Sequence, residues 1–129
     1  MKRPLIITGI VALFLVIFII SSFRQVSPDE IENAPEWQTL QEATENAAAD
    51  NKLILVDVFE IGCVFCRAME REVYPSQSVR AVLDRDYHPV KVNGNSDIVI
   101  RYKGEEILSK DFAAMMGVTA FPYTVILDA

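Results

Sequence analysis

The stretch from Leu53 to Cys66, LILVDVFEIGCVFC, carries the strongest structural signal in the sequence. Its first seven residues are apolar and mostly branched apart from Asp57, which is typical of a buried parallel strand. Gly62 ends this strand, and two cysteines separated by two residues follow it. We expect a helix to begin at Cys63. The cysteine pair is therefore predicted to follow a buried strand and to open a helix.

Helices and strands alternate on both sides of this stretch. Apolar residues at helical spacing predict helices over residues 37–49, 79–83 and 109–116. Strands are expected over residues 53–59, 87–92 and 123–127, with a small hairpin over residues 97–102 and 105–108. Ser109 is the expected N-cap of the last helix, and Gly117 is expected to end it. This order predicts an α/β layer fold.

The first 24 residues differ from the rest of the chain. Lys2 and Arg3 precede a run without charged side chains, Leu5–Phe23. As a helix this run measures about 28 Å, close to the roughly 30 Å thickness of a bilayer core. We expect residues 1–24 to form an uncleaved transmembrane anchor. A cleavable signal sequence is the alternative, although the run is long for one and lacks a good cleavage site.

Both alternatives place the rest of the chain outside the cytoplasm, because positive residues before an apolar helix stay on the cytoplasmic side. The expected location is the periplasmic side of a bacterial inner membrane, or the periplasm or medium after cleavage. We expect a linker over residues 25–36 and one domain over residues 37–129. From Gln25 onward nine Lys and Arg face eighteen Asp and Glu, a net charge of −9. This balance argues against nucleic acid as a partner.

The chain ends at Asp128 and Ala129, directly after the last expected strand. Small α/β domains rarely leave a strand edge and a sheet face uncovered. We therefore expect the domain to be truncated at its C-terminus. A partner protein that covers the open face is the alternative.

The spacing of Cys63 and Cys66 allows a disulfide at the first turn of a helix. Unpaired backbone N–H groups there stabilise a thiolate on Cys63 and lower its pKa. Such a thiolate attacks a substrate disulfide, and Cys66, one turn on, resolves the mixed disulfide. Two alternatives remain open. The pair could be a static disulfide, or half of a zinc site with His88 as the one histidine in the chain.

A wider set of residues resembles the thioredoxin superfamily. It comprises Ile54–Asp57, the CVFC motif and Gly117–Pro122 (GVTAFP). The run Glu70–Pro75 (EREVYP) and the hairpin before Ser109 are closer to one branch, the exported thioredoxins of the SoxW type and the C-terminal domain of the DsbD transmembrane reductase. The resemblance covers residues 37–129. It implies a thioredoxin fold, a central mixed sheet flanked by helices, lacking the last strand and helix and preceded by one transmembrane helix.

The resemblance also implies roles for individual residues. Cys63 and Cys66 would be the redox pair. Asp57 would lie buried beneath the second cysteine and exchange a proton with it, because burial raises the pKa of a carboxyl group. Pro122 would form a cis peptide bond and present the backbone of Phe121 to a bound substrate. Substrate would also contact the residues around the cysteines, Gly62, Val64 and Phe65.

Two departures from the family pattern concern the redox potential. Gly62 stands where an aromatic residue usually precedes the first cysteine, and Val64 and Phe65 replace the usual Gly-Pro. Neither side chain between the cysteines carries a positive charge that would stabilise a thiolate, which favours a reducing or moderate potential.

We therefore expect a thiol–disulfide oxidoreductase that reduces disulfides of exported proteins. It would need no metal or organic cofactor, because the disulfide itself carries the electrons. A transmembrane electron donor of the DsbD kind is the expected partner, and the N-terminal helix would tether the protein to the membrane. A disulfide oxidase or isomerase is one alternative. A non-catalytic peptide-binding module with a static disulfide is the other.

Overall fold

The structure is a computed structural model that describes residues 3–24 and 31–129. The chain divides into two compact units, residues 1–30 and residues 31–129. The first unit contains helix α1 (Arg3–Arg24). Within the described ranges, no helix combines the length and the apolar character needed to cross a membrane. Residues 1–2 of the predicted anchor and residues 25–30 of the predicted linker lie outside the described residues.

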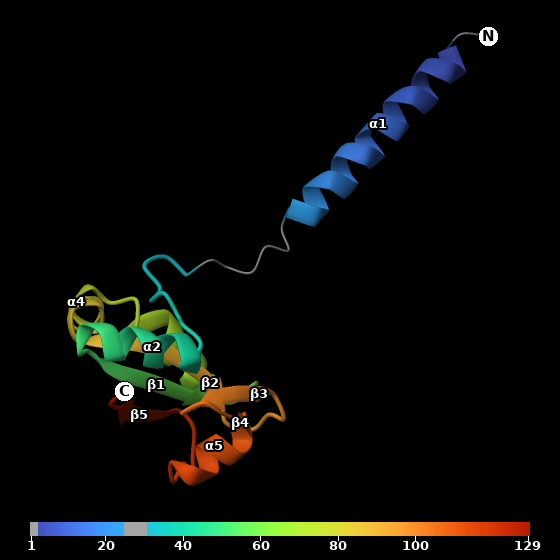
Figure 1. The fold of residues 1–129 in the computed structure, drawn as a ribbon. Coiled ribbons are helices and arrows are strands. Elements are labelled where there is room, and N and C mark those ends of the chain that lie inside the picture. Colours follow the sequence, from blue (N-terminus) through green and yellow to red (C-terminus); the bar gives the residue numbers. More distant parts are fainter. Residues whose placement is uncertain (1–2, 25–30) are drawn as a thin grey trace. The chain divides into compact units, whose positions relative to one another are not determined.

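The second unit contains all the strands that the structure describes. Its elements in chain order are α2 (Leu40–Asp50), β1 (Leu53–Phe59), α3 (Val64–Ala68), the π-helix η1 (Met69–Val73), α4 (Gln77–Asp86), β2 (Tyr87–Asn93), β3 (Val99–Tyr102), β4 (Glu105–Leu108), α5 (Ser109–Met115) and β5 (Tyr123–Leu127). In Figure 1, α2 packs across β1 and β2, and the β3–β4 hairpin lies next to α5.

The central sheet has three strands in the order β2-β1-β5. β1 runs parallel to β2 and antiparallel to β5, so the sheet is mixed, as the resemblance implied. The register sets Asp57 opposite Lys91 on β2 and opposite Thr124 on β5. Residues directly opposite one another project from the same face of a sheet. These three side chains therefore share one face.

The two faces of β1 are covered by different helices, because successive side chains of a strand point to opposite faces. Ile54, Val56 and Val58 pack in the hydrophobic core with residues of α2 and α5. On the opposite face, Leu55 borders a cavity together with residues of α4. The sheet is thus sandwiched between helices, which confirms the predicted α/β layer architecture.

Helix α2 begins later than the predicted position 37 because Thr39 caps it. The Thr39 hydroxyl accepts a hydrogen bond from the Glu42 N–H at 3.2 Å, and the Glu42 carboxylate accepts one from the Thr39 N–H at 2.9 Å. This reciprocal capping satisfies two N–H groups that the helix leaves unpaired. Asn51 in the left-handed conformation caps the helix after Asp50, one residue beyond the predicted end at residue 49.

The prediction that Ser109 is the N-cap of the last helix is wrong. Leu108 is the N-cap of α5, and Ser109 is the first residue inside the helix. The Ser109 side chain is 1 % exposed and donates a hydrogen bond to the Ser96 carbonyl at 2.8 Å. The hydroxyl that would cap the helix in an isolated segment therefore bonds instead to the loop before β3, which is distant in the sequence.

Between the end of α3 and Pro75 the chain does not continue as an α-helix. The structure places the π-helix η1 there, and the Tyr74 N–H donates to the Met69 carbonyl at 3.0 Å. A bond between residues five apart is wider than the normal turn of an α-helix. Tyr74, which follows this turn, is only 3 % exposed.

Candidate active site

The two cysteines are joined in a disulfide, with their Cα atoms 5.3 Å apart. Cys63 is the N-cap of α3, and its Sγ accepts a hydrogen bond from the Cys66 N–H at 3.1 Å. The predicted helix start at Cys63 is confirmed. A hydrogen bond donated to sulfur stabilises its charged form. Cys63 is half-buried, whereas Cys66 is 6 % exposed, so an incoming substrate meets Cys63 first.

Large apolar side chains surround the disulfide on the surface. Ile61 is 86 % exposed, Val64 is 65 % exposed and Phe65 is 73 % exposed. Gly62 between them has a φ of +89°, a backbone conformation that residues other than glycine rarely adopt. Exposed apolar residues that cluster around a reactive group mark an interaction surface.

The Phe121–Pro122 peptide bond is cis, the isomer that the resemblance implied. Pro122 directly precedes β5, whose first residue, Tyr123, pairs with Val58 near the carboxyl end of β1. Cys63 follows the same end of β1. The sheet register therefore brings the cis-proline and the disulfide to the same edge of the sheet.

Gly94 makes room for the residue before the cis-proline. A Cβ atom built on Gly94 would lie 2.6 Å from Cε1 of Phe121 and 2.7 Å from Cγ1 of Val58. Separations this short do not occur between packed carbon atoms, so only glycine fits without a shift of its neighbours. The turn after β2 thus helps to position Phe121.

Asp57 is buried in the middle of β1, as expected, and is 1 % exposed. Desolvation by burial raises the pKa of this carboxyl group, while the Tyr74 hydroxyl and the Lys91 charge act in the opposite direction. Neither carboxyl oxygen makes a hydrogen bond of normal geometry within the described part of the chain. A carboxyl group of this kind can hold or release a proton nearer to neutral pH than an exposed one.

Lys91 is a component of the site that the sequence analysis missed. Its Nζ lies 2.5 Å from Oε1 of Glu70, 5.3 Å from the ring centre of Trp37 and 4.8 Å from that of Phe59. The ammonium group is therefore held between one carboxylate and two aromatic faces. The lysine could have been found from the pairing of the two predicted strands, because the parallel register sets Lys91 beside Asp57.

His88 lies away from the cysteines. It pairs with Ile54 near the start of β1, and Cys63 follows the other end of that strand. Its ring contacts Gln38 at 3.2 Å and Asp50 at 3.0 Å. Across residues 3–24 and 31–129, no three His, Cys, Asp or Glu side chains are grouped so that they could hold a metal ion.

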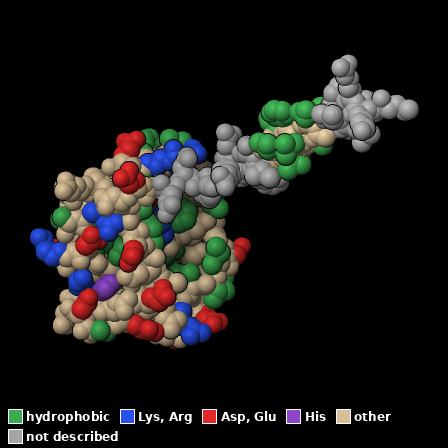
Figure 2. Space-filling view, turned by 90° about the horizontal axis from the view of Figure 1, so that it is seen from above, with side chains coloured by type: hydrophobic (Ala, Val, Ile, Leu, Met, Phe, Trp, Pro, Cys, Tyr) green, Lys and Arg blue, Asp and Glu red, His purple; other side chains and the backbone are tan. Residues whose placement is uncertain are grey.

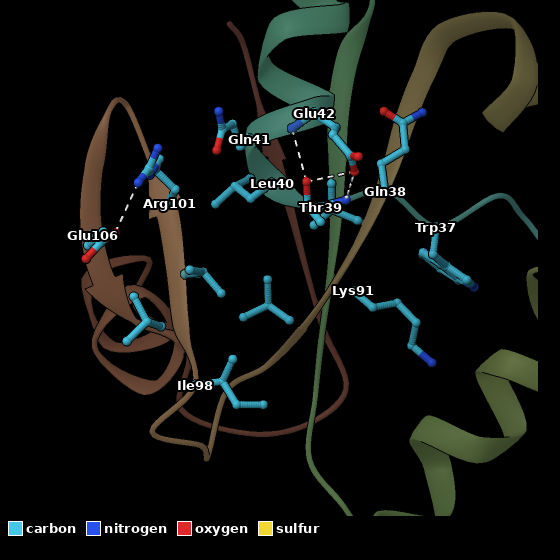
Figure 3. Close-up of a pocket in the computed structure, with 14 residues that line it drawn as sticks. Trp37, Gln38, Thr39, Leu40, Gln41, Glu42, Lys91, Ile98, Arg101 and Glu106 are labelled. Carbon is cyan, nitrogen blue, oxygen red and sulfur yellow. Dashed lines mark hydrogen bonds and ion pairs between the residues drawn. The ribbon is translucent and has the colours of Figure 1, made fainter.

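A cavity of about 560 Å³ lies between the start of α2, the strand β2 and the β3–β4 hairpin. Figure 3 shows the Thr39–Glu42 cap on one side of it and the Arg101–Glu106 ion pair on the other. Neither cysteine lines this cavity. The disulfide instead lies next to the exposed apolar side chains of Ile61, Val64 and Phe65.

Charged side chains of both signs are interspersed on the face of the domain that Figure 2 shows. They do not gather into one acidic patch there, although the sequence is acidic from Gln25 onward.

Comparison with known proteins agrees with this geometry. The family model for a thioredoxin-like domain matches residues 40–129. A solved structure named "DsbH Oxidoreductase" is similar with a TM-score of 0.59 and 20% sequence identity, over 79% of this chain and 71% of that chain. At this identity the likeness concerns the fold. Comparison with curated protein sequences finds no significant match. The chain therefore belongs to the thioredoxin-like family.

Proposed function

We propose that the protein is a thiol–disulfide oxidoreductase that acts through Cys63 and Cys66. The observation that carries this proposal is the hydrogen bond from the Cys66 N–H to the Cys63 Sγ, at a half-buried helix start beside exposed apolar residues. A static disulfide needs neither an accessible outer sulfur nor a donor directed at it. The similar solved structure bears the name of an oxidoreductase, which agrees with the proposal.

The proposed reaction starts from the reduced protein. The Cys63 thiolate attacks one sulfur of a substrate disulfide, that S–S bond breaks, and the released substrate thiolate takes up a proton. The Cys66 thiol then gives its proton to the Asp57 carboxylate, and the Cys66 thiolate attacks the Cys63 sulfur. The second substrate thiolate leaves and is protonated. The substrate gains two electrons and two protons, and the protein is left with a newly formed Cys63–Cys66 disulfide.

Asp57 is suited to the second step because its carboxyl group is buried. It lies on the sheet face opposite to the core that contains residues of α2 and α5. A base is most useful when its pKa lies near the working pH. Burial moves the pKa of Asp57 in that direction. Phe121 and Pro122 would align the substrate backbone, while Gly62, Val64 and Phe65 would contact its apolar side chains.

We propose reduction of exported proteins as the direction of the reaction. Val64 and Phe65 place no positive charge between the cysteines. Strong oxidants depend on a highly stabilised thiolate. The measured potential distinguishes the alternatives. A value near −270 mV supports a reductase, whereas one near −120 mV supports an oxidase.

We further propose that the domain works outside the cytoplasm. Lys2 and Arg3 before the apolar run Leu5–Phe23 support export, with this segment as an anchor or a signal sequence. A reductase in an oxidising compartment must be reduced again after each cycle. A transmembrane electron donor of the DsbD kind is the proposed partner for this step.

Insulin reduction by the purified, pre-reduced protein tests the catalytic assignment. Cys63→Ser should abolish the activity, because no nucleophile remains. Cys66→Ala should retain the first step and accumulate a mixed disulfide on Cys63, visible on a non-reducing gel. Reduction by Cys63→Ser at the wild-type rate would overturn the proposal. A Cys63–Cys66 disulfide that resists reduction below about −300 mV would support the static module instead.

A further inference from the structure

Three polar side chains from separate elements lie near one another on the sheet face that carries Asp57. Asp57 lies on β1, and Thr124 lies opposite it on β5. Tyr74 follows the π-helix η1, and its hydroxyl interacts with both of them. The proposed mechanism assigns a role to Asp57 but none to the tyrosine.

The position of Tyr74 depends on the π-helix. The bond from the Tyr74 N–H to the Met69 carbonyl spans five residues, so the backbone fits one more residue into this turn than an α-helix would. Turns of this kind are frequent at functional sites. Trp37 packs edge-on against the Tyr74 ring, with centres 5.1 Å apart and planes at 88°. The ring is thereby held in one orientation.

The Tyr74 hydroxyl and the Asp57 carboxyl group are chemically complementary. Both are buried, and neither has a hydrogen-bond partner of normal geometry in the described residues. They nevertheless lie close enough for each to shift the pKa of the other. Buried polar groups without partners are rare. An ionised carboxylate only accepts hydrogen bonds, whereas a phenol donates one, so each supplies what the other lacks.

The electrostatics of the two groups agree with this pairing. Desolvation raises the pKa of Asp57, and the Tyr74 hydroxyl lowers it. Desolvation, followed by the charge of Asp57, raises the pKa of Tyr74, so the phenol remains a donor. The other groups that face Asp57 are Lys91 on β2, which lowers its pKa, and Glu70 on η1, which raises it.

We infer that Tyr74 is a positioning residue, whose hydroxyl donates a hydrogen bond to the Asp57 carboxylate and orients it to receive the proton of Cys66. The Thr124 hydroxyl, on the other side, donates to the phenol oxygen and orients it. The catalytic part of this inference rests on the proposed function. The interaction between Tyr74 and Asp57 does not.

Tyr74→Phe tests the inference, because it keeps the ring against Trp37 and removes only the hydroxyl. The titration midpoint of Asp57 is read from its side-chain carboxyl resonance in ¹³C NMR of the oxidised full-length protein. Asp57→Asn identifies the resonance by its loss. Tyr74→Phe should raise the midpoint, because the carboxylate loses a donor. An unchanged midpoint would overturn the inference.

Tyr102→Phe is the matched control. Tyr102 also packs edge-on against an aromatic ring, that of Phe112 at 5.3 Å, but it lies on β3, outside the central sheet that contains Asp57. Its variant should leave the midpoint of Asp57 unchanged. If Tyr74→Phe does not fold, Thr124→Val, at an exposed position, decides instead. A raised midpoint supports the inference, and an unchanged one overturns it.

Activity supplies a second measurement. The rising limb of the rate of insulin reduction against pH should move to higher pH in Tyr74→Phe by the same interval as the Asp57 midpoint. At pH values below the Asp57 midpoint, the variant should be slower than the wild type by a factor of ten for each pH unit by which the midpoint has moved. At alkaline pH the two proteins should have the same rate. A midpoint that moves while the protein reduces nothing would refute the proposed function alone. A rate profile that stays in place while the midpoint moves would refute the catalytic role of Tyr74.

Discussion

Replacing Asp57 with asparagine should stabilise the oxidised protein at neutral and alkaline pH. Asparagine has nearly the same shape and carries no charge. The wild-type carboxyl group is 1 % exposed, and its pKa is raised chiefly by desolvation. Ionising it inside the folded domain is therefore less favourable than ionising it in the unfolded chain, where an aspartate has a pKa of about 3.9.

The sign and size of the effect follow from linkage. Between the unfolded and the folded pKa of Asp57, the folded state binds more protons than the unfolded state, so the free energy of unfolding falls as pH rises. Above the pKa of Asp57 in the folded state, the loss of unfolding free energy no longer changes with pH. It amounts to about 1.4 kcal/mol for each unit by which folding raises that pKa. Each kcal/mol corresponds to roughly 4–8 °C in Tm for a domain of this size.

Urea unfolding at intervals from pH 4 to pH 9, followed by circular dichroism, measures the difference between Asp57→Asn and the wild type. This difference should grow in favour of the variant as pH rises and then level off at the folded pKa. Asp111→Asn, at an exposed position on α5, should show no such trend above pH 6. A difference that is independent of pH, or that grows in favour of the wild type, would refute the reasoning.

Two further substitutions test how local contacts support the site. Gly94→Ala places a Cβ 2.6 Å from Phe121 Cε1. It should lower the free energy of unfolding by about 1–3 kcal/mol and slow insulin reduction. Gly9→Ala is the control, because nothing lies within 4 Å of the added Cβ, and it should change neither quantity. Thr39→Ala removes the cap that bonds Glu42 and should cost about 1 kcal/mol in urea unfolding, whereas Thr39→Ser should stay near the wild type; equal losses in both would argue against the capping role.

Local sequence signals predicted the elements that carry the site. The bounds of β1 and β5 agree with the predicted strands, residues 53–59 and 123–127. Both are short apolar runs bounded by residues that favour turns, which is a signal contained within the strand itself. Cys63 caps α3 as predicted, because a change from strand to helix at a glycine is also a local pattern.

The N-terminus of α5 shows where local reasoning fails. A serine before an apolar helical pattern is a good N-cap, but Ser109 bonds the Ser96 carbonyl from inside the helix. The partner lies thirteen residues away, in a loop whose position depends on how the β3–β4 hairpin folds back. Propensity ranks the possible caps of an isolated helix and contains no information about such a partner.

The sequence by itself determined that two cysteines follow a buried strand at the start of a helix, and that an aspartate lies within that strand. The tertiary structure alone decided what surrounds that aspartate. Lys91 and Thr124 reach it through strand register, and Tyr74 reaches it through one π-turn. These contacts join residues far apart in the chain. They depend on backbone geometry that a shift of one residue would change, whereas hydrophobic periodicity reports only on neighbours.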